Sequence, residues 1–171
     1  MNEPQLNDLM ERFQSRFYGK YRGSVTTVDE DTKQIKAKVP AVLDDQETGW
    51  CMPCVPYAGD GVGIVFLPEK GSGVWIEFEG GDLSYPIWSG CYWREGEMPD
   101  DAAPAVKVIV TKSPHKILLD DDQESITFSD SNENSIALDS EGLHFDRGDG
   151  SVLVNDSEVN VNDGALEVSS A

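Results

Sequence analysis

Hydrophobic residues in the last third of the chain recur in pairs whose two members stand two positions apart. Seven pairs occur, and their first members are separated by 9, 10, 7, 9, 7 and 7 residues, with Asp, Asn, Ser and Gly between them. Side chains two positions apart on an extended chain lie on the same face. Each pair therefore predicts a very short strand with one apolar face, followed by a polar turn. The pairs are Ile117/Leu119, Ile126/Phe128, Ile136/Leu138, Leu143/Phe145, Val152/Val154, Val159/Val161 and Leu166/Val168.

No helix or aromatic-rich second face in this region is available to cover the pairs. Leaving them in water would forfeit about 25 cal/mol for each Å² of apolar surface that stays unburied. Several identical chains wound about one axis would bring matching pairs into a shared core and would pair the open strand edges. We therefore predict an intertwined assembly with the fourteen paired residues at its core. A disordered acidic tail is the alternative, and the regular spacing and β-branched content favour order.

The N-terminal residues 4–18 predict a short amphipathic helix, with Pro4 in its first turn. A helix of this length is not stable alone, so it must pack on the body of the protein or on a partner. Its apolar stripe consists of Leu6, Leu9, Met10, Phe13 and Phe17.

From Gly19 to Trp93 short strands alternate with turns. Val25–Val28 and Ile35–Val39 flank an acidic turn and predict a hairpin, and alternation from Val74 to Glu79 places Val74, Ile76 and Phe78 on one face. Five or six short strands predict a small closed barrel. The polar, proline-bearing residues 94–104 predict a linker.

Charge is also distributed unevenly along the chain. The 171 residues carry 13 Lys and Arg against 32 Asp and Glu, for a net charge of −19, and residues 114–171 hold two of these cations and 14 of the acids. We expect the acids to coat the outside of the C-terminal assembly. Nucleic-acid affinity comes largely from Lys and Arg, so the acidic balance disfavours a nucleic-acid partner. No apolar run approaches the roughly 18 residues that span a bilayer, and the N-terminus lacks the features of a secretory signal peptide, which predicts synthesis in the cytoplasm.

A series of motifs from residue 19 to residue 122 resembles, in order and spacing, the OB-fold domain and spike of phage baseplate assembly protein V. The same domain occurs in the central spikes of contractile phage tails, in extracellular contractile injection systems and in the valine-glycine repeat spikes of type VI secretion. The motifs are Gly23–Val25, Trp50, Val55–Gly59, Gly63, Leu67–Gly71, Val74–Asp82, Pro86–Trp93, Thr111–Ser113 and His115–Asp121.

Together with the patterns above, the resemblance implies an all-β fold with four parts. These are an N-terminal helical segment (1–18), an OB-fold barrel (19–93), a linker (94–104) and a trimeric β-prism or β-helix spike (105–171). It also implies a structural homotrimer rather than an enzyme. This central spike would be part of a phage tail-like particle and would pierce the target envelope on sheath contraction, so the target membrane is contacted only mechanically.

Partners follow from the resemblance and from what this chain lacks. The chain is too short for the hub domains of type VI spikes, so we expect separate hub and baseplate proteins, bound by the apolar stripe of residues 4–18, and indirect contact with the inner tube. A separate PAAR-like tip protein is expected to bind Leu166, Val168 and Ala171. Some family spikes end in a His-x-His iron site, which His144 in Leu143-His144-Phe145 does not provide.

The remaining candidate chemistry is weak, and we predict no catalytic residue, metal or cofactor. Cys51-x-x-Cys54 has no following helix and no second pair, so the cysteines are expected to be buried small hydrophobes rather than a redox or zinc site. Asp120–Asp122 predicts a solvated turn rather than a calcium loop.

His115 is expected to pack or hydrogen-bond, His144 to point outward, and the aromatic residues of the barrel segment to pack in the core or at the trimer interface. These aromatics are Trp50, Trp75, Trp88, Tyr92 and Trp93. The alternatives are an OB-fold nucleic-acid-binding protein with a disordered acidic tail and a thiol or zinc module.

Overall fold

The computed structural model describes Gln5, Met10 and residues 15–169, except for the side chains of Glu167 and Ser169. The chain divides into two compact units, an N-terminal unit (Met1–Glu97) and a C-terminal unit (Met98–Ala171). The elements of the N-terminal unit are β1 (Tyr21–Asp29), β2 (Gln34–Lys38), α2 (Pro40–Leu43), β3 (Met52–Pro53), β4 (Ala58–Gly59), β5 (Val62–Gly63), β6 (Gly73–Phe78), the 3-10 helix η1 (Glu79–Gly81) and β7 (Pro86–Tyr92). The C-terminal unit contains β8 (Val106–Val110), β9 (Lys116–Asp120), β10 (Ser125–Ser129), β11 (Asn134–Asp139), β12 (Gly142–Arg147), β13 (Gly150–Val154), β14 (Glu158–Val161) and β15 (Leu166–Ser169).

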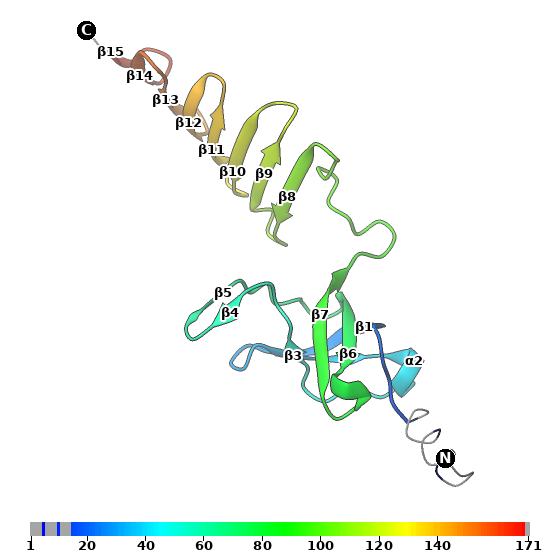
Figure 1. The fold of residues 1–171 in the computed structure, drawn as a ribbon. Coiled ribbons are helices and arrows are strands. Elements are labelled where there is room, and N and C mark those ends of the chain that lie inside the picture. The colour runs from blue at the N-terminus through cyan, green and yellow to red at the C-terminus, as the bar shows by residue number, and fades with distance from the viewer. Residues whose placement is uncertain (1–4, 6–9, 11–14, 170–171) are drawn as a thin grey trace. The chain divides into compact units, whose positions relative to one another are not determined.

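The N-terminal unit is built on a curled sheet with strand order β2-β1-β6-β7-β3 (Figure 1). All its neighbouring strands are antiparallel except β3 and β7, which run parallel. A backbone bridge between Ile35 of β2 and Cys51, the residue before β3, joins the two outer strands and closes the sheet into a barrel. The predicted hairpin corresponds to β1 and β2, and the all-β fold class is confirmed.

The barrel encloses one hydrophobic core. Along β6 the buried positions alternate as predicted, with Val74, Ile76 and Phe78 inside and Trp75 and Glu77 half-buried. The core consists of Val25, Ile35, Ala37, Val39, Cys51, Val74, Ile76, Phe78 and Trp88.

The N-terminal segment is joined to the barrel at Phe17. Its ring meets Phe78 edge-on with centroids 6.4 Å apart, and its N–H donates to the carbonyl of Gly81 over 2.9 Å. Gly81 has φ +77°, and a Cβ there would lie 2.9 Å from the Cβ of Arg16, so the close approach of the two segments requires glycine. Most of the predicted helix of residues 4–18 lies outside the described residues.

The C-terminal unit is an antiparallel meander of eight strands in chain order, from β8 to β15 (Figure 1). Each strand pairs with the next through a short turn. Seven of these strands, β9 to β15, carry one predicted hydrophobic pair each. Residues 106–169 are therefore ordered strands and turns, and the alternative of a disordered acidic tail is wrong.

Candidate functional site

The eight-stranded sheet carries one predominantly apolar face, which we call the apolar face. The registers place all fourteen predicted residues on it in two columns that run across the sheet from strand to strand. One column is Leu119, Ile126, Leu138, Leu143, Val154, Val159 and Val168. The other is Ile117, Phe128, Ile136, Phe145, Val152, Val161 and Leu166. Every turn therefore returns the chain with its pair on the same side of the sheet.

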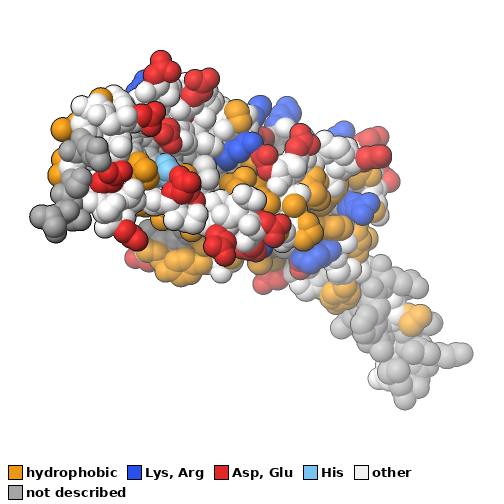
Figure 2. Space-filling model, turned by 90° about the horizontal axis from the view of Figure 1, so that it is seen from above, with side chains coloured by type: hydrophobic (Ala, Val, Ile, Leu, Met, Phe, Trp, Pro, Cys, Tyr) orange, Lys and Arg blue, Asp and Glu red, His pale blue; other side chains and the backbone are white. Residues whose placement is uncertain are grey.

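The apolar face is open in the single chain. Phe145 is 44% exposed and Leu166 is 60% exposed, and none of the described residues of the C-terminal unit is buried. Figure 2 shows hydrophobic side chains (orange) at the molecular surface among acidic ones (red). A sheet with one uncovered apolar face does not have a complete core, so this face requires a partner.

The opposite face of the sheet is more polar along its centre. Its middle positions, aligned across the strands, are Val108, Leu118, Thr127, Ala137, His144, Leu153 and Asn160. His144 lies on this face as expected, and its Nε2 is 3.1 Å from Oδ1 of Asp139. This mixture of small, polar and apolar side chains suits a surface in contact with water better than a shared core.

Side chains at the strand ends hold the turns. Oδ1 of Asp120 accepts the N–H groups of Asp122 and Gln123, both over 3.0 Å, as expected for a turn. Oδ1 of Asn155 does the same for Ser157 and Glu158. Such Asx turns satisfy backbone donors without a regular ladder partner.

Two aspartates in the turns have lowered pKa values for the same reason. The pKa of Asp130 lies well below its usual value, chiefly because the amide of Asn134 donates to Oδ2 over 2.7 Å and the N–H groups of Asn132 and Asn134 add to this. The pKa of Asp139 is lowered first by the N–H of Glu141. Hydrogen bonds to the charged form favour ionisation, so both turns are built around carboxylates.

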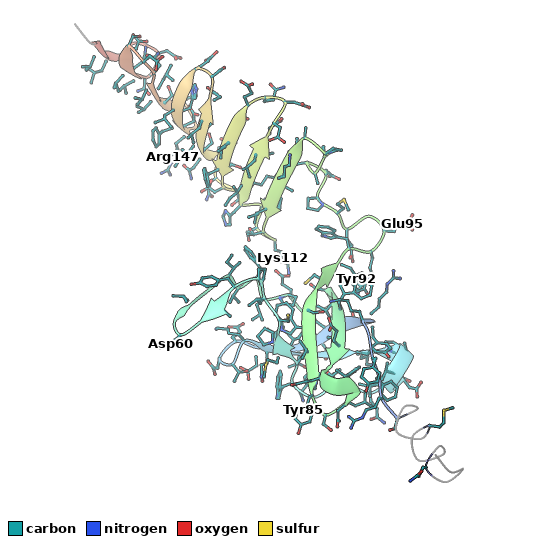
Figure 3. All side chains as sticks on the ribbon, viewed as in Figure 1. Asp60, Tyr85, Tyr92, Glu95, Lys112 and Arg147 are labelled. Atoms are coloured by element: carbon teal, nitrogen blue, oxygen red, sulfur yellow. The ribbon has the colours of Figure 1, made fainter. Side chains whose placement is uncertain are left out.

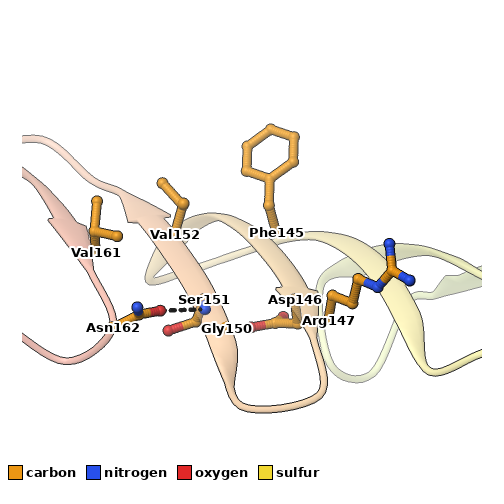
Figure 4. Close-up of a pocket in the computed structure, with 8 residues that line it drawn as sticks. All are labelled: Phe145, Asp146, Arg147, Gly150, Ser151, Val152, Val161 and Asn162. Carbon is orange, nitrogen blue, oxygen red and sulfur yellow. Dashed lines mark hydrogen bonds between the residues drawn. The ribbon is translucent and has the colours of Figure 1, made fainter.

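A shallow depression on the apolar face contains Arg147 at its rim (Figure 4). The side chains of Phe145, Val152 and Val161 rise from its floor, and Asn162 Oδ1 accepts the N–H of Ser151 over 2.9 Å below them. Figure 3 labels the same arginine near the middle of the meander. The depression is too open to enclose a small ligand, and it is part of the apolar face.

The expectation that the cysteines are buried holds for Cys51 and is wrong for Cys54 and Cys91, whose side chains are exposed. Cys51 is fully buried, with Sγ 3.2 Å from Thr48 Oγ1, and its burial raises the pKa of the thiol. Cys54 stands three positions after Cys51 and Cys91 three after the buried Trp88, so alternation points both away from the core. Within the described part of the chain, no three His, Cys, Asp or Glu side chains are grouped closely enough to hold a metal ion.

The barrel aromatics divide between core and surface. Trp88 is buried, whereas Trp50 and Trp93 are exposed, so core packing explains only part of the predicted set. On the surface, the Arg22 guanidinium lies 5.6 Å from the ring centroid of Trp75 and 5.5 Å from that of Tyr92. These two rings therefore hold a cation of the same chain.

The predicted partner-binding residues lie at the two ends of the chain. Met10 is 51% exposed, Phe17 packs on the barrel as described above, and Leu6, Leu9 and Phe13 are outside the described residues. At the other end, Leu166 and Val168 are each 60% exposed on β15, the outermost strand of the described sheet. Ala171 is outside the described residues.

Sequence reasoning missed two parts of the molecule's apolar surface. Ile109 continues one column of the apolar face onto β8, opposite Ile117; its signal was hidden because Val106, Val108 and Val110 alternate on the other face. The second part surrounds the β4–β5 hairpin, where the uninterrupted run Ile64–Phe66 is exposed together with Tyr57 and Val62. That run was visible in the sequence but has no alternation to indicate a face.

Two known protein families match the chain, one in each unit. Residues 21–93 match the type VI secretion system/phage-baseplate injector OB domain, and residues 106–167 match the phage baseplate V C-terminal trimerisation domain. No curated protein matches the chain. Among the described residues no helix is long and apolar enough to cross a membrane. All of the paired residues of the apolar face except Val168 thus lie within the stretch matched as a trimerisation domain.

Proposed function

The chain belongs to the phage baseplate V family, whose members are structural proteins of baseplates and spikes, and we propose that its homotrimer is the central spike that pierces a target envelope when a contractile sheath shortens. Self-association follows from the trimerisation domain, and membership of a phage tail-like particle follows from the baseplate family. The piercing role, the hub and the tip protein are the proposed part. The spike's action is mechanical, and no covalent step is assigned to it.

The observation that carries the proposal is the open apolar face with its two continuous columns. Three copies facing one axis would bury these columns against one another, with each level contributing two side chains per protomer to a common core. Close-packed apolar cores resist deformation, and continuous antiparallel pairing along the meander ties each level to the next. Such a shaft suits a part that must transmit force without bending.

The mass of the purified full chain tests trimerisation, and a pair of adjacent substitutions tests the face. Light scattering should give three times the chain mass of 18.8 kDa. Phe128→Asp places a charge on the apolar face, where burial without a partner is strongly unfavourable, and should abolish the trimer. Thr127→Asp, one position away on the opposite face, should leave it intact. Equal effects of the two substitutions would contradict the assignment of the core.

We propose that the apolar stripe of residues 4–18 docks the spike on its hub or baseplate. The exposed Met10 supports this, together with the attachment of Phe17 to the barrel, which fixes the end of the stripe. Phe17 itself then packs on the barrel of its own chain and not on the hub. Leu9→Asp should lose co-purification with a co-expressed hub protein while the trimer mass is unchanged. Asn7→Asp, off the stripe, is the matched control, and retention of the hub by Leu9→Asp would refute the docking role.

We also propose that a PAAR-like tip protein covers the last described strand. The exposed Leu166 and Val168 on β15 and the unpaired outer edge of that strand in the described sheet support an apolar, strand-adding partner. Val168→Asp should weaken binding of the purified tip protein, measured by calorimetry on samples that remain trimeric. Asn160→Asp, on the opposite face, should bind normally, and unchanged binding by Val168→Asp would exclude this surface.

A further inference from the structure

Arg147 is unusual for its charge. It is the only Lys or Arg after Lys116 in the sequence, whereas 14 Asp and Glu residues lie between Asp120 and Glu167. Lys107 and Lys116 both form ion pairs within their own chain, with Asp121 and Asp101 respectively. Arg147 forms no ion pair with any residue that the structure describes. A guanidinium in such an acidic unit that has no carboxylate partner in its own chain is available to another chain.

The strand register places Arg147 on the apolar face. It ends β12 and has the same parity as Leu143 and Phe145, so alternation directs the three side chains to one side. Figure 4 shows the Arg147 side chain extending to the same side of the sheet as Phe145. Its cross-strand neighbours are Asn134 and Gly150, and neither supplies a carboxylate. The guanidinium therefore stands at the border of the surface that the trimer must cover.

The turns along the opposite edge of the sheet are acidic. The three turns follow β9, β11 and β13, and none of them contains Lys or Arg. Lys107 lies near this edge on β8, and it is already paired with Asp121. In a ring of three identical chains each interface is heterologous, so the Arg147 edge of one protomer meets the acidic edge of the next. The acids in these turns are Asp121, Asp122, Glu124, Glu141 and Asp156.

A threefold axis keeps equivalent residues at the same height. Arg147 ends β12, and Glu141 immediately precedes the first residue of the same strand. The two therefore mark opposite edges of the sheet at one level, and symmetry brings the exposed Glu141 of the next protomer toward Arg147 at that level.

We propose that Arg147 of each protomer forms an ion pair with Glu141 of the neighbouring protomer, and that three such pairs fix the register of the trimer. The inference rests on the proposed homotrimeric spike. The apolar columns repeat at every level, so they discriminate weakly between aligned chains and chains displaced by one hairpin. A single cation at one level provides the distinction, as one polar group does in some coiled coils.

Charge reversal in the full-length trimer tests the pair. The variants are Arg147→Glu, Glu141→Lys and the doubly reversed chain, compared by analytical ultracentrifugation at low and high salt. Each single variant should lower the trimer association constant by about 100-fold, because it removes three ion pairs and each pair contributes a factor of about five to this constant. The double variant should recover most of the loss, and high salt should shrink the differences. Lys116→Glu, which changes the charge equally but whose partner Asp101 is in the same chain, is the control and should not be rescued by Glu141→Lys.

The outcomes separate this inference from the proposed function. A wild-type chain that is not trimeric would refute the spike assignment itself. A trimeric wild type in which Arg147→Glu associates normally, or in which the double variant loses as much as the two single variants together, would overturn the ion pair alone. Far-ultraviolet circular dichroism of each variant confirms that the barrel remains folded.

Discussion

The two units of this chain use similar side chains in alternating strands and reach opposite states of burial. The N-terminal barrel curls until Ile35 and Cys51 are joined by a backbone bridge and nine hydrophobic residues are enclosed. The C-terminal meander never closes, and its apolar columns remain open in one chain. Pattern alone does not decide whether a core is complete, because closure depends on how the strands are connected. A barrel closes on itself, whereas a meander of hairpins needs other copies.

Dilution should give the largest difference in hydrogen-exchange protection between the two units. If the core of the C-terminal unit forms between chains as proposed, its order depends on protein concentration, whereas that of the barrel does not. On dilution below the trimer dissociation range, amide hydrogen exchange should lose protection across residues 106–169 and keep it in β1, β6 and β7. Concentration-independent protection of both units would break the comparison.

Truncation of one isoleucine in each unit should give the next largest effect on stability and association. Ile76 is fully buried in the barrel and Ile136 is 41% exposed on the apolar face of one chain. Ile76→Ala should destabilise the barrel by about 2–5 kcal/mol with unchanged trimer mass. Ile136→Ala should leave the barrel transition in place and shift the trimer dissociation curve, with three cavities per assembly. Calorimetry at several concentrations distinguishes the two results, and an Ile136→Ala trimer of normal affinity would count against the shared core.

Gly142, at the start of β12, allows a test of the close backbone packing in the C-terminal unit. Gly142 has φ +142°, and a Cβ there would lie 2.3 Å from the carbonyl oxygen of Val154. Gly142→Ala therefore forces β12 and β13 apart, at about 1–3 kcal/mol per chain for the strained conformation. Gly150→Ala is the control, because its nearest neighbour would be 3.5 Å away. Thermal unfolding should shift only the C-terminal transition, and equal shifts for both variants would contradict the close approach.

The smallest expected effect concerns pH and the turn at Asp130. The pKa of its carboxyl is depressed in the folded state, so its contribution to stability is full above the ordinary value of 3.8 and is lost as the pH falls below it. Asp130→Asn removes this titration. The difference in unfolding midpoint between wild type and variant should be largest near neutral pH and should shrink below about pH 3.8. A difference that grows with acidification would reverse the assigned sign.

The sequence was most informative where alternation was regular. The hairpin of β1 and β2, the inner positions of β6 and all fourteen positions of the apolar face follow from a period of two, because a strand has only two faces. The common face of the pairs could be predicted from spacing, since each turn preserves their parity.

The rest could not be predicted because it depends on contacts distant in sequence. The parallel pairing of β3 with β7 involves two residues, Met52 and Pro53, that carry no strand pattern. On β8, three valines suggest the wrong inner face, and only the register with β9 places Lys107 and Ile109 on the apolar side. The role of Arg147 likewise emerges from its register, since its position between Asp146 and Gly148 gives no sign of which face it occupies.

The unbroken parity of the hairpins makes the meander modular. Adjacent strands in a sheet are about 4.8 Å apart, so each added or removed hairpin would change the reach of the protein by roughly 10 Å while leaving every remaining column continuous. Gain or loss of hairpins during evolution would therefore change the length of the C-terminal unit in fixed steps, with the same oligomer contacts at every level.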